Sequence, residues 1–395
     1  MKRILFVDDE PRMLDALRDR LRKQRARWDM VFCSNAAEAL AAFDRAPFDI
    51  VVSDMRMPVL DGPELLEQIK ARSPRTVRII LSGQADPAAT LRAIDASHQF
   101  LSKPCEAHAL RAVLERVCEL DALLTTEQAR DLAGSLDRLP PSPAIGAALV
   151  AAASRPGVSV SELSAIIVRD PALAAMVLRL VNSAYFELAQ PVASIPDAVS
   201  YLGADSMVSL VRSSRAFADV DLVTSHGSAI ETLRQHAELT ARLASRISPG
   251  PNAASAFTAG LLHDVGLLVL FRFMPAEIDE VMRTAVATGQ PIEVVEKQVL
   301  GFDHVELGAY VLGLWGLPLE IVDAIATHRR PGTLQDPSST VTSLHIANAL
   351  LDPSDALDEE FVARVGASPQ LARWRTEADA LCTSSASRWA IDRER

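Results

Sequence analysis

Residues 49–62 read DIVVSDMRMPVLDG, and this stretch decides the fold of the first third of the chain. Its run Ile50–Val52 has the β-branched content and the length of a central parallel strand. Asp54 follows at the carboxyl end of that strand, and a loop containing Pro58 and Gly62 then leads into a helix. Open α/β sheets place their chemistry at the carboxyl ends of their strands, so Asp54 is a candidate functional carboxylate.

Other predicted strands of this region also end in polar side chains. They are Asp8 and Asp9 after residues 3–7, Ser82 after residues 77–81, and Lys103 after residues 99–102. Clustered carboxylates repel one another, and Mg2+ would offset that repulsion. Asp54 could then attack a phosphoryl donor, while Ser82 and Lys103 neutralise the oxygens of the transferred group. Each side chain alone would fit an ordinary polar rim, but the set in this order favours a phosphoryl-accepting site.

In this combination of residues, positions 1–122 resemble the receiver domain of two-component response regulators. The matching signs are Asp8-Asp9, Asp54, Met57-Pro58, Asp61-Gly62, Ser82-Gly83 and Lys103-Pro104. The resemblance implies that Asp54 is the phosphoacceptor and that a sensor histidine kinase is the partner. It implies an Mg2+ ion held by Asp9, Asp54, the backbone carbonyl of Arg56 and, through water, Asp8. It further implies phosphoryl binding by Ser82 and Lys103, a rotating aromatic switch at Phe100, and a flavodoxin-like, five-stranded parallel sheet.

The composition sets limits on the rest of the chain. A length of 395 residues predicts two or three domains, and 49% hydrophobic with 5% aromatic residues fits a helical protein with a core. The net charge of -11 opposes a nucleic-acid groove, which needs a basic face. The four cysteines show no paired spacing, which predicts a reducing cytoplasm and no metal-thiolate site. We find no secretory signal and no apolar run that we expect to cross a membrane.

The end of the predicted receiver carries an apolar stripe. Leu110, Val113, Val117, Leu120 and Leu124 recur at spacings of 3, 4, 3 and 4, as in an a/d seam of two heptads. This seam can dock the last helix on its own sheet, or it can pair with a second subunit. Both can hold together, so we expect a homodimer through the Leu110–Leu124 helix.

After residue 122 the β/α alternation stops. We predict a helical linker over 123–138, an all-α domain over 139–355 and a helical extension over 356–395. Inside the all-α domain, amphipathic patterns predict helices over 144–154, 160–168, 171–183, 195–201, 206–218, 229–247, 253–273, 275–287, 292–300, 304–314, 318–328 and 339–351. In the first domain, helices are predicted over 11–25, 36–45, 62–72 and 87–96.

One predicted helix of the all-α domain is apolar except for the pair His263-Asp264. Burying that carboxylate without a partner is costly, so the pair calls for a counter-charge or a metal ion. Histidines from other helices could converge on it, and the candidates are His236, His304 and His328. Each histidine alone would more often be a hydrogen-bonded core residue.

Residues 135–355 resemble the HDOD domain, a relative of the HD phosphohydrolases and their HD-GYP branch. The resemblance rests on the blocks 139–143, 169–173, 180–186, 195–203, 260–266, 300–304 and 315–318. By that resemblance His236, His263, Asp264, His304 and His328 match ligand positions of the catalytic relatives. Three other positions depart from them: Leu267 for a lysine, Arg329 for a second histidine, and Asn348 for a closing aspartate. An amide is a weak ligand and a guanidinium repels a metal, so we expect no cofactor and no catalytic residue in this domain.

We therefore expect a cytoplasmic response regulator whose receiver, phosphorylated on Asp54, controls a non-catalytic HDOD domain that binds an unidentified output protein. The alternative is a metal-dependent cyclic-dinucleotide phosphodiesterase under receiver control, which the retained histidines keep open. A third interpretation takes the helices over 160–168 and 171–183 as a helix-turn-helix. The acidic net charge argues against that one, so we expect no nucleic-acid partner and no membrane.

Overall fold

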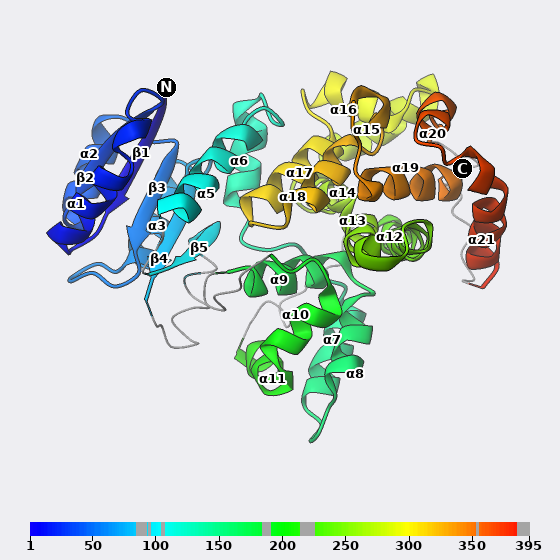
Figure 1. Ribbon diagram of the computed structural model, residues 1–395, viewed down its shortest axis with the longest axis horizontal. Coiled ribbons are helices and arrows are strands. Elements are labelled where there is room, and N and C mark those ends of the chain that lie inside the picture. The colour runs from blue at the N-terminus through cyan, green and yellow to red at the C-terminus, as the bar shows by residue number, and fades with distance from the viewer. Residues whose placement is uncertain are drawn as a thin grey trace. The chain divides into compact units, whose positions relative to one another are not determined.

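The computed structural model describes residues 1–83, 93, 96–103, 107–183, 191–213, 226–352 and 355–384. The chain divides into two compact units (Figure 1). The first comprises Met1–Arg138 with Arg179–Pro191 and Tyr310–Gly316, and the second comprises the remainder. Most of the predicted helix over 87–96 lies outside the described residues, as does Pro104.

The first unit contains a five-stranded parallel sheet. The strands are β1 (Lys2–Val7), β2 (Trp28–Cys33), β3 (Ile50–Asp54), β4 (Val77–Ser82) and β5 (Gln99–Ser102). Their order is β2-β1-β3-β4-β5, which confirms the predicted flavodoxin-like sheet. β3 lies in the centre and is buried along its whole length, as its β-branched run predicted. The sequence patterns had located every strand except β2, which is only partly buried and lies at the edge.

Helices follow the strands and fix the loops at the carboxyl edge of the sheet. They are α1 (Pro11–Arg20), α2 (Ala36–Arg45), α3 (Gly62–Arg72), α5 (Ala107–Leu120) and α6 (Glu127–Ser135). α1 ends earlier than predicted because the chain continues as a short 3-10 turn over Arg22–Gln24. α3 starts with a capping box in which Asp61 and Glu64 bond each other's backbone N–H groups. Gly62 at its first position packs on the backbone of Asp54, where a Cβ atom would collide.

The predicted apolar stripe is buried inside this single chain, but α5 ends at Leu120, so Leu124 lies beyond the helix and not on it as predicted. Leu110, Val117, Leu120 and Leu124 are all buried, and Val113 is half-buried. Four of the five predicted seam residues are therefore covered by other parts of the same chain, and only Val113 retains appreciable exposure. The homodimer stays a prediction, but the seam offers it little apolar surface.

A buried arginine ties α6, predicted as part of a linker, to the sheet of the first unit. Arg78 on β4 is 1% exposed, and its guanidinium donates to the carbonyls of Ala96, Pro74 and Thr76 and, at 2.8 Å, of Gly134 in α6. Burial lowers the pKa of Arg78 to about 10. His98 accepts from the Arg78 backbone N–H at 3.0 Å, and burial together with the Arg78 charge lowers the pKa of His98 well below its usual range. Residues 127–135 are thus part of the first unit's packing and not a detached linker.

The second unit is helical throughout the residues that the structure describes, as expected. Its helices are α7 (Pro143–Ala153), α8 (Val160–Ile167), α9 (Pro171–Val181), α10 (Ile195–Leu202), α11 (Ala204–Ser213), α12 (Gly227–Ile247), α13 (Ala253–Leu262), α14 (Val265–Phe273), α15 (Pro275–Thr288), α16 (Ile292–Val299), α17 (His304–Leu314), α18 (Leu319–Thr327), α19 (Ser339–Leu351), α20 (Glu359–Arg364) and α21 (Leu371–Ser384). The last two helices correspond to the predicted extension over 356–395. α9 and α17 each contribute their C-terminal residues to the first compact unit.

The predicted continuous helix over 253–273 is wrong, because the chain breaks at His263 and Asp264 into α13 and α14. The glycine after this break, Gly266, lies against the backbone of His304, where a Cβ atom would collide. The break places His263 and Asp264 beside the first turn of α17, which begins at His304.

One stretch, Gly250–Phe273, is long and apolar enough to cross a membrane by length and composition, which corrects the expectation that no such run exists. Of its most apolar window, 83% is buried inside the structure. That burial is what a core helix of a globular domain shows as well, so the stretch is weak evidence for a membrane span.

Candidate functional site

The first candidate site lies at the carboxyl edge of the parallel sheet. β3 delivers Asp54 to this edge, and β1 runs into Asp8 and Asp9. The ammonium of Lys103 lies between two of these acids, 2.7 Å from Asp8 and also in contact with Asp54. Asp54 further accepts the backbone N–H of Arg56 at 3.1 Å. The predicted acids and the lysine are therefore neighbours in space.

Burial and charge act on Asp54 in opposite directions. Burial raises the pKa of Asp54, the Asp8 charge adds to the rise, and Lys103 opposes it. Burial alone would lower the pKa of Lys103, but its bonds to Asp54 and Asp8 raise it. The two acids Asp8 and Asp54 against one ammonium leave excess negative charge, and Asp9 follows directly in the chain, so the set suits a hard divalent cation that prefers oxygen ligands.

The other predicted residues of this edge lie on adjacent strands. Ser82 ends β4, is buried, and donates its hydroxyl to the carbonyl of Gly83 at 2.8 Å. The backbone of Lys103 donates to the carbonyl of Ser82 at 2.6 Å, which holds the ends of β4 and β5 together. Phe100 on β5 is buried in the core cluster of the sheet.

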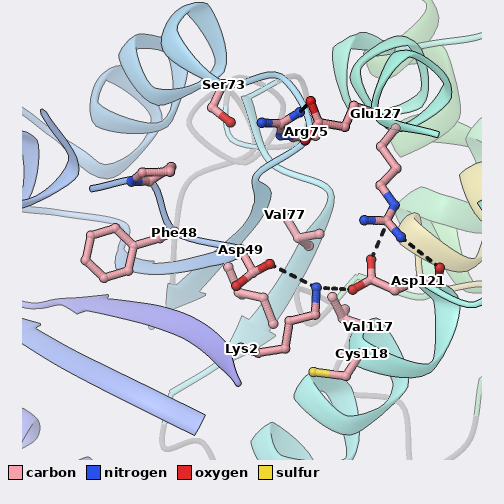
Figure 2. Close-up of a pocket in the computed structure, with 13 residues that line it drawn as sticks. Lys2, Phe48, Asp49, Ser73, Arg75, Val77, Val117, Cys118, Asp121 and Glu127 are labelled. Atoms are coloured by element: carbon pink, nitrogen blue, oxygen red, sulfur yellow. Dashed lines mark hydrogen bonds and ion pairs between the residues drawn. The ribbon is translucent and has the colours of Figure 1, made fainter. Parts of the chain in front are cut away.

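A pocket of about 250 Å3 lies at the opposite, amino-terminal edge of the same sheet (Figure 2). It is lined by Lys2, Asp49, Val77, Cys118 and Asp121, among others. Its charges are matched internally, since Lys2 bonds Asp49 at 2.9 Å and also contacts Asp121. Arg75 and Glu127 form a second pair at 2.7 Å. No surplus of charge in this lining points to a charged ligand.

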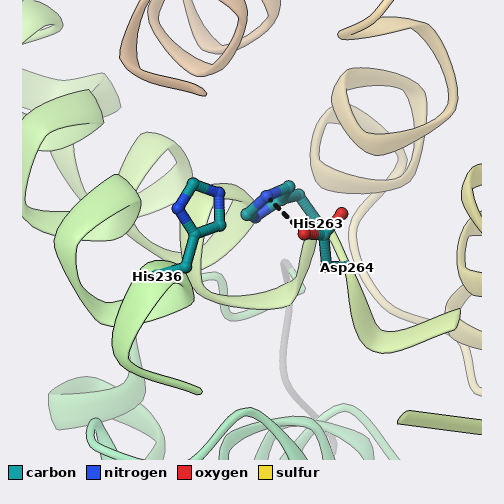
Figure 3. Close-up of side chains that lie close together, drawn as sticks. All are labelled: His236, His263 and Asp264. Carbon is teal, nitrogen blue, oxygen red and sulfur yellow. Dashed lines mark ion pairs between the residues drawn. The ribbon is translucent and has the colours of Figure 1, made fainter. Parts of the chain in front are cut away.

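The second candidate site is a buried cluster in the helical unit. α12 supplies His236, and the break between α13 and α14 supplies His263 and Asp264 (Figure 3). Ligand atoms of these three side chains all lie within 4.8 Å of one another. The structure thus brings together three of the histidines and acids proposed from the sequence. His328, at the end of α18, adds a ring whose centroid is 5.4 Å from that of His263.

Asp264 is the acid at the centre of this cluster. Its carboxylate lies 3.1 Å from His263 Nε2 and 3.5 Å from His304 Nε2. Burial alone would raise its pKa, but these two histidines hold the pKa of Asp264 well below its usual range. His304 is paired on its other side with Glu296, 2.6 Å from Nδ1. Burial opposes the effect, yet Glu296 and Asp264 raise the pKa of His304 to about 10.

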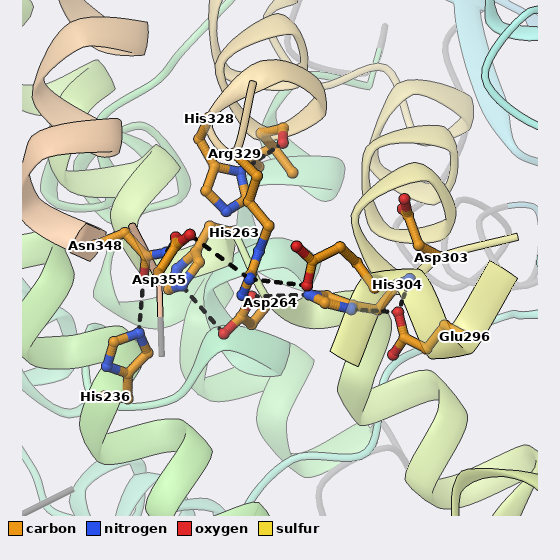
Figure 4. A network of polar contacts seen from close by, with 12 residues as sticks. His236, His263, Asp264, Glu296, Asp303, His304, His328, Arg329, Asn348 and Asp355 are labelled. Carbon is orange, nitrogen blue, oxygen red and sulfur yellow. Dashed lines mark hydrogen bonds and ion pairs between the residues drawn. The ribbon is translucent and has the colours of Figure 1, made fainter. Parts of the chain in front are cut away.

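Two of the three residues that depart from the catalytic relatives, Asn348 and Arg329, also take part in this network (Figure 4). Asn348 on α19 accepts from His236 Nε2 at 2.9 Å through Oδ1, and it donates to Asp355 at 2.6 Å through Nδ2. The guanidinium of Arg329 lies 3.3 Å from Glu293 and 3.9 Å from Asp355. Arg329 is therefore a cation inside the cluster.

Sequence reasoning missed Glu296 and Asp355, which position His304 and Asn348. Glu296 is 0% exposed although it sits on the otherwise amphipathic helix α16. A glutamate next to the apolar Val294 and Val295 was the one signal that could have indicated a buried acid. Asp355 lies in a loop, where no periodicity marks it.

Comparisons with known proteins agree with both units. The response regulator receiver domain matches residues 4–115, and the HDOD domain matches residues 139–331. The chain is therefore a response regulator with a receiver domain and an HDOD domain, and it belongs to two-component signalling.

Among curated proteins, the chain is 32% identical over 138 residues to the hydrogenase transcriptional regulatory protein HoxA of Cupriavidus necator, covering 34% of this chain and 26% of that one. It is 32% identical over 129 residues to the transcriptional regulatory protein GlrR of Escherichia coli strain K12, covering 32% and 29%. The chain thus spans less than a third of the length of these relatives. Among solved structures, the MmoQ response regulator from Methylococcus capsulatus is 28% identical, covers 60% of this chain and 98% of that one, and has a TM-score of 0.49.

Proposed function

We propose that this response regulator acts in the cytoplasm and accepts a phosphoryl group on Asp54 from a sensor histidine kinase. The observation that carries the proposal is the contact of Asp54 with Lys103 at the carboxyl edge of the sheet, beside Asp8. Asp9, Asp54 and the backbone carbonyl of Arg56 would hold Mg2+, with Asp8 acting through water. When bound, Mg2+ supplies the charge that neutralises the phosphoryl oxygens.

The chain's own residues define the transfer. An oxygen of the Asp54 carboxylate attacks phosphorus, the bond from phosphorus to the kinase imidazole breaks, and the electron pair returns to that imidazole. Lys103 exchanges its contact with Asp54 for one with a phosphoryl oxygen. The Ser82 hydroxyl turns from the Gly83 carbonyl to donate to another oxygen, and Phe100 is the aromatic that repacks as it does so.

Intact-mass measurement with a small phosphodonor and Mg2+ tests this assignment. We expect the wild type to gain one phosphoryl group per chain, and we expect Asp54→Asn to gain none because an amide is no nucleophile. Asp44→Asn, on an exposed helical position, is the control and should label like the wild type. Equal labelling of Asp54→Asn and wild type would refute the assignment.

We further propose that the HDOD domain acts by binding a protein and does not hydrolyse a cyclic dinucleotide. Support comes from Arg329, which places a fixed positive charge in the cluster, and from Asn348, which stands where a closing carboxylate is expected. Two-metal hydrolysis needs anionic ligands that lower the pKa of bound water. A pull-down comparing wild type with Asp54→Asn would identify the output protein.

The hydrolytic alternative is tested with full-length protein, added Mn2+ and a cyclic dinucleotide. We expect no turnover by the wild type and partial recovery in Asn348→Asp combined with Arg329→His, because these changes restore the missing ligands. Multiple turnovers by the wild type that vanish in His263→Ala would instead establish the phosphodiesterase.

Homodimerisation through the Leu110–Leu124 helix is a separate proposal, and light scattering of wild type and Val113→Glu tests it.

A further inference from the structure

The start of strand β5 is bonded to a buried arginine that comes from α9. Arg179 is 6% exposed, and its guanidinium donates to the carbonyls of Ser97 and Asp137, each at 2.5 Å. The same guanidinium lies over the ring of Trp315, 4.7 Å from the ring centroid. All four residues belong to the first compact unit, although α9 and α17, which lead to Arg179 and Trp315, begin in the second. We refer to Arg179, Trp315 and these two carbonyls as the Arg179 contact.

A second contact ties the end of α17 to the same strand and to α5. The side chain of Gln99, the first residue of β5, donates to the carbonyl of Gly313 at 3.4 Å. Gly313 also packs on the side chain of Leu120, where a Cβ atom would collide. The ends of α9 and α17 are therefore positioned by the amino end of β5 and by the last turn of α5.

The other end of β5 enters the candidate phosphoryl site. β5 contains four residues and spans about 13 Å, and Lys103 follows it directly, in contact with Asp54 and Asp8. In the strand order β2-β1-β3-β4-β5 it is an edge strand, so a hydrogen-bonded neighbour strand holds it on one side only. A change in the contacts of Lys103 can therefore shift β5 more easily than it could shift β3, which is held on both sides.

Two features make the Arg179 contact sensitive to such a shift. Hydrogen bonds weaken steeply with distance and are lost by about 3.6 Å, so a displacement of about 1 Å is enough to break either bond of the guanidinium. Trp315 is 3% exposed, and its Nε1–H has no acceptor among the described residues. A buried donor without an acceptor raises the free energy of this arrangement, and release of the contact is correspondingly less costly.

We propose that Arg179 couples the receiver to the HDOD domain. It holds the ends of α9 and α17 on β5 while Lys103 contacts Asp54, and it releases them when Lys103 turns to a phosphoryl oxygen. The inference rests on the proposed phosphorylation of Asp54. Arg179 acts through β5 and is a positioning residue, so its loss should leave phosphoryl transfer intact and remove the response of the two helices.

Hydrogen exchange of the full-length chain, measured for the C-terminal turns of α9 and α17, tests the coupling. In the wild type, a small phosphodonor with Mg2+ should raise exchange in both turns about fivefold or more. In Arg179→Met, exchange should be high without the phosphodonor and should not rise further, while intact mass shows the same gain of one phosphoryl group. Arg155→Met, at a side chain that is 58% exposed, is the matched control and should respond like the wild type.

An equilibrium measurement separates coupling from a purely structural role. Because linkage between two sites is reciprocal, a chain whose Arg179 contact is already released should bind a phosphoryl mimic more tightly. With Mg2+ present, we expect Arg179→Met to bind beryllofluoride about fivefold or more tightly than the wild type does, and Arg155→Met to bind it like the wild type. Arg179→Lys keeps the charge but lacks the planar fork, so its affinity should lie between the two, and it replaces Arg179→Met in every comparison if that variant does not fold.

Lys103→Met distinguishes failure of this inference from failure of the proposed function. If the wild type gains no phosphoryl group, the proposed function fails, and Lys103→Met decides the inference because it removes the contact with Asp54 without any phosphodonor. Exchange in both turns should then rise about fivefold, and unchanged exchange overturns the inference. In a wild type that is labelled, unchanged exchange in both turns overturns it, as does an equal response of Arg179→Met and wild type.

Discussion

Asp54 in the receiver and Asp264 in the HDOD domain are both nearly buried, at 8% and 4% exposure, yet their charges are balanced differently. Asp54 meets a lysine whose side chain is 18% exposed, beside the exposed Asp9. Asp264 meets histidines that are fully buried. The receiver site is partly exposed to solvent, whereas the HDOD site carries its counter-charges within the fold.

The difference shows why one acid cluster can be a switch while the other has a fixed role. A flexible ammonium can leave one carboxylate for a phosphoryl oxygen at small cost, because water replaces the lost contact. A buried cation has no such replacement, and removing it leaves uncompensated charges in a low-dielectric interior. The two sites should therefore respond very differently to the same kind of deletion.

The largest effect is expected from Arg329→Leu. Its side chain is 10% exposed and lies between acids, so we expect a loss of about 3–5 kcal/mol in the unfolding free energy of the HDOD domain. Arg330→Leu is the matched control, since that side chain is 66% exposed, and it should change the value by less than about 0.5 kcal/mol. Urea unfolding, with hydrogen exchange to locate the affected helices, provides the measurement. If Arg329→Leu lowered the unfolding free energy by less than Arg330→Leu does, the buried cation would not stabilise the HDOD domain as the comparison of the two sites requires.

The next effect comes from the receiver, which also has a fully buried titratable group, His98. It tests whether burial of a charged or titratable group, and not the domain in which it lies, determines how strongly stability depends on it. The pKa of His98 is lowered by burial and by Arg78, so the folded receiver excludes a proton that the unfolded chain binds. Stability should therefore be constant above about pH 6.5 and fall as pH decreases below it, by about 1.4 kcal/mol per pH unit at most.

His98→Gln should flatten this dependence in hydrogen exchange of β4 and α6 between about pH 5.5 and 7.5, an interval of about one unit either side of an ordinary histidine pKa. His108→Gln, at an exposed position, should leave the slope unchanged. A slope that is the same in wild type and His98→Gln would assign the acid sensitivity to other groups.

The smallest effect is expected from Lys103→Met. The lysine contacts Asp8 and Asp54, but its side chain is 18% exposed, so water can replace part of these contacts and its loss should cost about 1 kcal/mol. Added Mg2+ should restore most of that loss by replacing the ammonium charge. Receiver unfolding with and without Mg2+ measures both values. A loss as large as that of Arg329→Leu, not restored by Mg2+, would mean that the two sites are balanced in the same way.

Much of the receiver was predictable because each strand carries its own local signal. The run Ile50–Val52 predicted the central strand, and polar residues marked the carboxyl ends of the strands, so Asp8, Asp54 and Lys103 could be expected to meet. The seam of α5 was ambiguous, because a periodic stripe specifies that a face is buried and not what covers it. The same holds for α6, whose tie to Arg78 depends on a residue some fifty positions earlier.

The sequence by itself determined the two fold classes, the polar edge of the sheet that carries Asp8, Asp54 and Lys103, and the presence of His263-Asp264 on an apolar segment. These features depend on local periodicity and on the order of strands, and both can be recognised from the order of residues in the sequence. Only the tertiary structure decided where the segment 253–273 breaks, that Glu296 and Asp355 complete the HDOD network, and that His263 and His304 both lie against Asp264. Those properties arise from contacts between residues far apart in the chain, such as His236 with Asn348 and His304 with Asp264, and no sequence pattern records such a partner.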